Sequence, residues 1–149
     1  MLDDGDPVRI RVPLRAGADY ESYWEEVLEE VYLAGDVMVY IDEVSALSPK
    51  STPGPWLTAI WTRGREFNIG GVAATQRPRR IPQLLISEAE VFFIFRLNIL
   101  GDRQYLSEFT GDIVQEQTMD KYGFYYFNSE KMDSPLYVPK LREVEVEEV

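Results

Sequence analysis

The sequence contains no cysteine and no histidine. Without cysteine the chain has neither disulfides nor thiolate metal sites, a composition that fits a reducing interior. Without histidine it cannot by itself supply a Ser-His-Asp triad, a histidine general base or a histidine-ligated zinc. No apolar run approaches the ~20 residues that a membrane span needs. The acidic start MLDDGDPVRI is unlike a signal peptide.

The 149 residues suit one domain with a hydrophobic core. The net charge of −11 argues against a basic coat for nucleic acid. The charge is uneven, because the segment from Arg63 to Arg103 holds seven arginines against four acids, a local charge of +3. Two interpretations stay open for this segment: an arginine cluster that faces an anion, and an ordinary solvated surface.

Apolar periodicity and turn residues predict an α/β fold with a largely parallel sheet covered by helices on both faces. Helices are expected over 19–34, 56–67 and 101–111, with a short one over 84–89. Asp19 is the expected N-cap of the first helix and Gly35 its stop. Strands are expected at 8–12, 37–41, 69–76, 91–97, 123–127 and 136–139, and an exposed loop at 48–55.

Two adjacent acids, Asp42 and Glu43, follow the expected strand VMVYI at 37–41. A carboxylate at the end of a buried strand is costly to desolvate unless a cation or hydrogen-bond donors satisfy it. Mg²⁺ is a natural partner, because it prefers oxygen ligands and binds one or two carboxylates beside phosphate oxygens. The second carboxylate could polarise a water for attack on a phosphate. The alternative is that the pair merely starts a turn or caps a helix.

Other polar groups are expected at the same edge of the sheet. Thr75 and Gln76 end the strand over 69–76 and could hold a water or a phosphate oxygen. The alternative is a polar turn before Pro78. Arg63 and Arg65 close the helix over 56–67, where they could reach the phosphate of a neighbouring subunit or simply face the helix macrodipole.

Three segments taken together, VMVYIDEVSAL, TRGREFNIGGVAATQRPRRIP and AEVFFIFRLN, resemble the HerA–FtsK family of RecA-like, ring-forming DNA-translocating ATPases. The first is similar to the Walker B strand of that family, and the second to the segment that joins an arginine-bearing helix to a glutamine sensor strand. The third is similar to the strand that follows. The resemblance covers about residues 8 to 141, and its most specific feature is ATQRP about 30 residues after the acid pair.

The resemblance implies a role for each matched residue. Asp42 would hold Mg²⁺ through water, and Glu43 would activate the attacking water. Gln76 would sense the γ-phosphate of ATP. Arg63 or Arg65 would serve the nucleotide of the adjacent subunit in trans, and the sequence does not choose between them.

The resemblance also implies a domain plan and partners. Residues 1–141 would form a partial RecA-like ATPase domain, followed by an acidic tail at 142–149. The elements of this domain would be Walker B at 37–43, the arginine-bearing helix at 56–67, the sensor strand at 69–76, a strand at 91–97 and a closing hairpin at 123–139.

The implied partners are ATP, Mg²⁺, double-stranded DNA and further copies in a ring, expected to be a hexamer. A cytoplasmic protein of bacterial, archaeal or phage origin is expected. Arg77, Arg79 and Arg80 are not among the residues matched to the family, and two interpretations stay open for them: contact with a phosphate of nucleotide or DNA, and an ion pair at a subunit interface.

The sequence departs from that family at one element. The family begins with a strand, a glycine-rich loop that ends in Gly-Lys-Ser/Thr, and a helix, and nothing before Asp42 matches this element. Three explanations stay open: a C-terminal piece of a longer ATPase, one half of a split enzyme whose phosphate loop lies on another chain, and a degenerate relative that binds no nucleotide and keeps the fold for assembly. The chain alone is therefore expected to lack ATPase activity.

Two other functions remain as alternatives to the motor ATPase. One is a non-catalytic assembly or regulatory module with a degenerate ATPase fold. The other is a nuclease-like two-carboxylate metal site, which would need further acids converging on Asp42. The candidate suppliers are Glu66, Glu88 and Glu90.

Overall fold

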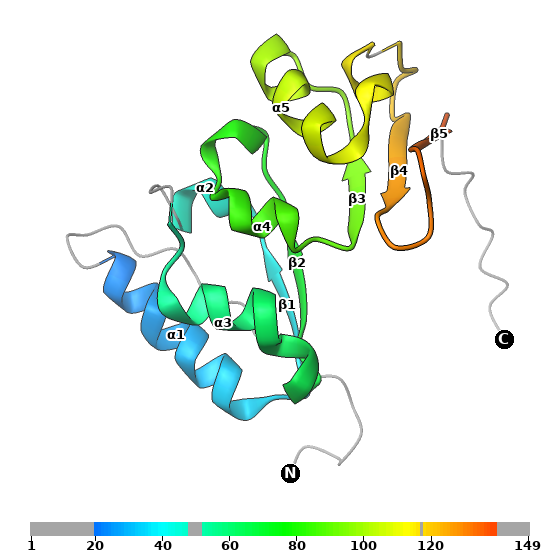
Figure 1. Cartoon of the computed structure of the whole chain (residues 1–149). Coiled ribbons are helices and arrows are strands. Elements are labelled where there is room, and N and C mark those ends of the chain that lie inside the picture. The colour runs from blue at the N-terminus through cyan, green and yellow to red at the C-terminus, as the bar shows by residue number, and fades with distance from the viewer. Residues whose placement is uncertain (1–19, 48–51, 117, 140–149) are drawn as a thin grey trace, which may run out of the picture.

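The computed structural model describes residues 20–47, 52–116 and 118–139, which fold as alternating helices and strands (Figure 1). The helices are α1 (Tyr20–Ala34), α2 (Val44–Leu47), α3 (Pro55–Arg63), α4 (Gln83–Ser87) and α5 (Leu100–Thr110). The 3₁₀ turns are η1 (Gly64–Phe67), η2 (Pro78–Arg80) and η3 (Asp112–Gln115). The strands are β1 (Met38–Ile41), β2 (Gly70–Ala73), β3 (Val91–Ile94), β4 (Phe124–Asn128) and β5 (Leu136–Val138).

The first half of the described chain forms a parallel strand pair packed under helices. Gly35 ends α1 with a positive φ of 64°, a conformation that glycine adopts without strain. β1 and β2 pair in parallel from Met38 opposite Gly70 to Ile41 opposite Ala73. α3 connects them and packs beside α1 on one face of the pair. The core between these layers consists of Leu28, Ile41, Val44, Leu57, Ile60, Ile69 and Leu85.

The second half forms a separate antiparallel sheet in the order β3-β4-β5. Val91 lies opposite Asn128, and the β4–β5 hairpin closes the sheet with Tyr125 opposite Tyr137. α5 covers one face of this sheet. The core beneath it consists of Ile86, Ile94, Leu106, Val114, Met119 and Tyr125.

The prediction of one largely parallel sheet is wrong for the described strands. Within the part of the chain that the structure describes, only β1 and β2 pair in parallel, because β2 and β3 are not hydrogen-bonded to each other and β3 pairs antiparallel with β4. Ile81 packs against both cores and so links the two halves. Among the described residues parts of the strands stay uncovered, since Met38 and Tyr40 on β1 and Phe93 on β3 are each more than half exposed.

Most predicted elements appear, with shifted ends. The strand expected at 69–76 ends at Ala73, and the strand expected at 91–97 ends at Ile94, because the following residues turn into loops. α2, directly after the acid pair, and the short turn η2 were not expected from the sequence. The strand at 8–12, the N-cap Asp19 and the tail at 142–149 lie outside the described residues. Within the described part, no helix combines the length and the apolarity needed to cross a membrane.

The core predicts a contrast between two leucines. Leu57 on α3 is 2% exposed and Leu33 on α1 is 71% exposed. We expect Leu57→Ala to lower the free energy of unfolding by roughly 2–5 kcal/mol, because it removes buried methyl groups and leaves a cavity. Leu33→Ala should change it by less than about 0.5 kcal/mol. Urea denaturation followed by circular dichroism measures both, and equal effects would contradict the assignment of the core.

Candidate functional site

The acid pair lies where β1 ends, at the carboxyl edge of the parallel pair. Asp42 is exposed, whereas Glu43 is partly buried. Glu43 has a positive φ of 52°, which is uncommon for a residue with a side chain and occurs most often in turns and functional sites. Val44, fully buried, donates its peptide N–H to the carbonyl of Ala74 at 2.9 Å. The turn after β1 is therefore fixed against the end of β2.

The carboxylate of Glu43 accepts hydrogen bonds from both sides of this edge. Ser45 Oγ and Thr75 Oγ1 donate to Oε1, at 2.6 and 2.8 Å. The peptide N–H of Gln76 donates to Oε2 at 3.2 Å. The contact from Gln76 uses its backbone, and its side chain is exposed. The structure thus brings together two of the predicted site residues, Glu43 and Gln76.

These hydrogen bonds control the protonation of Glu43. Burial raises the pKa of the Glu43 carboxyl, but the hydroxyls of Ser45 and Thr75 and the peptide N–H groups of Gln76 and Ser45 lower it, and the net pKa lies below the ordinary glutamate value. Donors aimed at the oxygens favour the charged form. Glu43 is therefore ionised at neutral pH, the state required to accept a proton from water.

The loop that holds Glu43 is anchored to α5. The peptide N–H of Arg77 donates to Thr75 Oγ1 at 3.0 Å. Arg77 Nε pairs with Asp102 Oδ2 at 2.9 Å, and the peptide N–H of Arg79 donates to Asp102 Oδ1 at 3.1 Å. Asp102 is 1% exposed. A buried carboxylate on α5 thus positions the residues that bind Glu43.

Asp102 was not recognised from the sequence as part of the site. Its only local signal is an acid in the first turn of a helix, where carboxylates are common. Its partner Arg77 was expected to bind phosphate or a neighbouring subunit. The structure instead pairs Arg77 within its own chain.

Arg63 and Arg65 lie away from the acid pair. Both are exposed, Arg63 as the last residue of α3 and Arg65 in η1. η1 precedes β2, so both arginines are near the end where β2 begins, whereas Glu43 lies where the strands finish (Figure 1). Arg65 pairs with Glu90 at 3.2 Å through well-exposed side chains, a contact of little energetic weight. Neither arginine reaches Glu43 within the same chain.

The arginine-rich segment is not one anion-facing cluster. Four of its seven arginines have partners within the chain. Arg65 pairs with Glu90 and Arg77 with Asp102, while Arg96 and Arg103 donate to the carbonyls of Met119 and Gln115. The other three, Arg63, Arg79 and Arg80, are exposed. Most of these arginines therefore join different parts of the chain through ion pairs or hydrogen bonds.

The described residues contain no group of three or more acids, histidines or cysteines arranged to hold a metal ion. The nuclease-like alternative needed several acids around Asp42, and this part of the chain offers none. Asp42 itself is a single exposed carboxylate at the end of a strand. Such a donor fits a hydrated Mg²⁺, which keeps most of its waters and takes further ligands from a phosphate.

Sequence comparison finds two relatives among well-described proteins, while no family model matches the chain. The chain is 33% identical over 84 residues to the DNA packaging ATPase P9 of Enterobacteria phage PRD1. It is 25% identical over 103 residues to the probable helicase MJECL08 of Methanocaldococcus jannaschii. The matches span 56% and 67% of this chain, but only 36% and 20% of the two relatives.

Structure comparison identifies the same kind of fold. The genome packaging NTPase B204 of Sulfolobus turreted icosahedral virus 2, solved with ATP-gammaS, superimposes with a TM-score of 0.72 at 15% identity, over 86% of this chain and 66% of B204. Its complex with AMPPCP gives a TM-score of 0.74 at 16% identity over 86% of this chain and 65% of B204. The described chain is therefore an α/β structure with the fold of part of a packaging NTPase, and its sequence is similar to a packaging ATPase.

The hydrogen bonds to Glu43 predict a measurable change of its pKa. Thr75→Val removes one donor to the carboxylate and should raise the pKa of Glu43, because the charged form loses a favourable contact. The pKa is measured by NMR titration of the Glu43 carboxyl carbon. Thr62→Val, on the exposed side of α3, is the matched control and should leave it unchanged.

The same variant changes how stability depends on pH. The folded-state pKa of Glu43 is depressed, so the carboxylate stabilises the fold above the unfolded-state pKa, and this contribution is lost as the pH falls through the folded-state pKa. Thr75→Val should weaken that dependence. An unchanged pKa of Glu43 in Thr75→Val would show that the hydroxyl does not stabilise the charged form.

The buried ion pair predicts a loss of stability. Arg77→Ala removes the cation beside Asp102, and we expect it to lower the free energy of unfolding by about 1–3 kcal/mol, less than for a fully buried pair because Arg77 is 37% exposed. Arg80→Ala, on the exposed side of η2, is the matched control and should have an effect near zero. Thermal or urea denaturation measures both variants, and a neutral Arg77→Ala would contradict the anchoring role of Asp102.

Proposed function

We propose that this chain is the C-terminal part, from the Walker B strand through the closing strands, of a HerA/FtsK-like motor ATPase. The motor would couple ATP hydrolysis to packaging or translocation of double-stranded DNA, and this chain would be inactive without a separately supplied phosphate loop. One observation carries the proposal: Glu43, ionised and held by the loop that contains Thr75 and Gln76, stands beside an exposed Asp42 at the carboxyl edge of the parallel strands. This edge is where α/β proteins bind their ligands. The relative P9 is itself a DNA packaging ATPase, which favours packaging in a virus-infected cell.

The site residues have distinct proposed roles. Glu43 accepts a proton from the attacking water, a role that needs an ionised carboxylate. Asp42 would hold a hydrated Mg²⁺, which when bound neutralises charge on the phosphates. The exposed side chain of Gln76 responds to the γ-phosphate while its backbone stays bonded to Glu43. Asp102 acts through Arg77 and Thr75 and is a positioning residue.

The proposal requires contributions from outside these residues. The sequence has no Gly-Lys-Ser/Thr phosphate loop, so another polypeptide segment supplies the groups that bind the phosphates. Arg63 and Arg65 are exposed and remote from Glu43 in their own chain. That position favours action on the nucleotide of an adjacent subunit in a ring, which we propose is a homo-hexamer around DNA.

A non-catalytic assembly or regulatory module is the second candidate. The observation that favours it is the same absence of a phosphate loop from the sequence. In that case the chain would bind intact ATPase subunits through the same fold, and Glu43 would serve only to fix the turn after β1.

A complementation experiment separates the two functions. The chain is mixed with a segment that carries a strand, a Gly-Lys-Ser phosphate loop and a helix, and ATP hydrolysis is measured with Mg²⁺. We expect hydrolysis from the mixture and not from the chain alone. Glu43→Gln should lower the rate by about 10²–10⁴-fold, because the amide cannot accept the proton. Glu130→Gln, an exposed substitution of the same kind, should have no effect.

The other outcomes are equally informative. Association without hydrolysis, unaffected by Glu43→Gln, supports the assembly module. Hydrolysis by the chain alone at more than about 1 per second, the scale of a working enzyme, would contradict the need for a separate phosphate loop.

A further inference from the structure

Four residues other than glycine have a positive φ in the described part of the chain: Asp36, Glu43, Asn68 and Tyr122. Aspartate and asparagine are enriched in this conformation, because their short polar side chains can hydrogen-bond locally. Glu43 is the central residue of the candidate site. Tyr122, with a φ of 69°, is the bulky residue of the four, and for a bulky side chain this conformation is an outlier that lowers stability.

Tyr122 occupies the third position of a tight turn that precedes β4. The peptide N–H of Gly123 donates to the carbonyl of Asp120 at 3.0 Å and closes the turn. A turn with a positive φ at its third position is normally built with glycine or asparagine there. Gly123 is required for a different reason, since a Cβ on it would lie 2.7 Å from the hydroxyl of Tyr137. A tyrosine at position 122 therefore makes the turn less stable than a glycine would.

Contacts with other elements hold this strained turn in place. The hydroxyl of Tyr137 on β5 accepts from the peptide N–H of Asp120 at 2.9 Å and donates to its carboxylate at 3.3 Å. Arg96, after β3, donates to the carbonyl of Met119. Strained residues persist when their surroundings fix them in this way, and they gather at binding and catalytic sites.

The side chain of Tyr122 contributes little to the packing of the fold. It is 66% exposed. The ammonium of Lys121, which is also exposed, lies 5.0 Å from the centre of the ring, within the range of a cation–π contact. The turn therefore presents an aromatic ring to solvent with a positive charge beside it.

Tyr122 lies at the same edge of the strands as Glu43. β4 runs antiparallel to β3 with Tyr125 opposite Ile94, so the residues just before β4 lie beyond the end of β3. Figure 1 shows β3 running in the same direction as β1 and β2. The end of β3 is therefore on the edge where Glu43 is held, and this edge is where α/β proteins bind their ligands.

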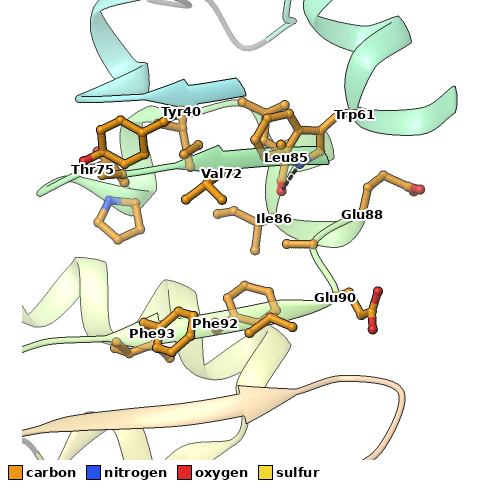
Figure 2. A pocket seen from close by; sticks show the side chains of 18 of the residues that line it. Tyr40, Trp61, Val72, Thr75, Leu85, Ile86, Glu88, Glu90, Phe92 and Phe93 are labelled. Atoms are coloured by element: carbon orange, nitrogen blue, oxygen red, sulfur yellow. Dashed lines mark hydrogen bonds between the residues drawn. The ribbon is translucent and has the colours of Figure 1, made fainter. Parts of the chain in front are cut away.

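A cleft of about 1510 Å³ lies between the β2 side and the β3 side of this edge (Figure 2). Figure 2 shows Thr75 on one side of the cleft and Phe93 on the other. Residues 95–98, which follow β3, also line it. A ligand that reaches from Glu43 to Tyr122 would therefore cross the mouth of the cleft.

We propose that Tyr122 stacks on the base of the nucleotide whose phosphates lie beside Glu43. The inference rests on the proposed function and adds a base-binding position to the same site. In ATP the adenine lies at the opposite end of the molecule from the γ-phosphate, so the base must lie away from Glu43. Flat bases stack on aromatic side chains, and the charge of Lys121 complements that of the ligand. The strained turn then holds the ring in the position that stacking needs.

Phe95 is another exposed aromatic residue near this edge, with 56% of its surface accessible. Its ring packs on that of Phe124 with the centroids 5.3 Å apart, and Phe93 contacts the same ring at 5.9 Å. Phe95 thus belongs to a row of side chains on the face of the antiparallel sheet, whereas Tyr122 stands in the loop beyond its end. Phe95 therefore supplies the matched control.

NMR spectroscopy of the full chain tests the stacking without hydrolysis. The probes are Mg·ATP and Mg·tripolyphosphate, which share the phosphates but differ in the base. We expect millimolar ATP to shift the ring protons of Tyr122 upfield, because they would lie over the ring current of the base. Tripolyphosphate should leave these protons unchanged, and the ring protons of Phe95 should respond to neither probe.

Substitutions separate the ring from the turn. Tyr122→Phe keeps the ring and should bind ATP as the unchanged chain does. Tyr122→Gly removes the ring and should weaken ATP binding by about 5- to 100-fold, the range for the loss of one stacked base. The same variant should raise the midpoint of urea denaturation, because glycine adopts a positive φ without strain. Phe95→Leu should leave ATP binding unchanged.

Several outcomes would overturn the proposal. They are a Tyr122 ring that does not respond to ATP, and a larger effect on binding from Phe95→Leu than from Tyr122→Gly. A lower urea midpoint for Tyr122→Gly would assign the side chain to the fold, and an equal shift with tripolyphosphate would mean that a phosphate, and not a base, reaches the turn.

The base site and the motor function fail separately. A response of Tyr122 to ATP without hydrolysis in the complemented mixture would refute only the motor function. Hydrolysis in that mixture with a KM for ATP that Tyr122→Gly leaves unchanged would refute only the base site.

Discussion

The structure depends on the hydrogen bonds that join the end of β1 to the end of β2. Ala74 donates to the carbonyl of Ile41, and the next bond runs back from Val44 to Ala74. These two bonds fix the turn that contains Asp42 and Glu43 and bring the following loop within reach of the Glu43 carboxylate. Without this pairing, the acids would be two charges on an exposed loop and would have no defined partners.

A chain of polar contacts extends from that turn to the second sheet. Glu43 binds Thr75, Thr75 binds the peptide N–H of Arg77, and Arg77 pairs with Asp102 on α5. A buried carboxylate is tolerable only when it is satisfied, and Asp102 is satisfied by one side chain and one backbone group. The position of Glu43 is therefore coupled to α5, which packs on a different core from α1 and α3.

Among the described residues, Met38 and Tyr40 on β1 and Phe93 on β3 are not covered by other parts of the chain. Parallel sheets are normally covered on both faces, and strand edges are normally paired or protected. The described part of this chain therefore leaves apolar strand residues exposed. The matches to P9 and B204 cover 36% and 66% of those two proteins.

The sequence by itself determined most of the helices and strands, and it determined which polar residues lie at the carboxyl edge of the parallel strands. Helical periodicity ending at Gly35 predicts α1, and the aromatic run VFFIF predicts β3, since such patterns express local preferences. The apolar run before Asp42 and the ATQRP segment also identify Glu43 and Gln76 as neighbours, because strand ends meet at one edge of a sheet.

Only the tertiary structure decided how the strands pair and which side of them is covered. An apolar run such as VFFIF carries no information about its neighbour, so the sequence did not predict that β3 pairs with β4 and stands apart from β2. Nor did it assign Arg77 to Asp102, 25 residues away, since an ion pair depends on distance in space. It likewise did not show that Gln76 binds Glu43 through its backbone, because every residue except proline carries a backbone N–H and only the fold decides where that group points.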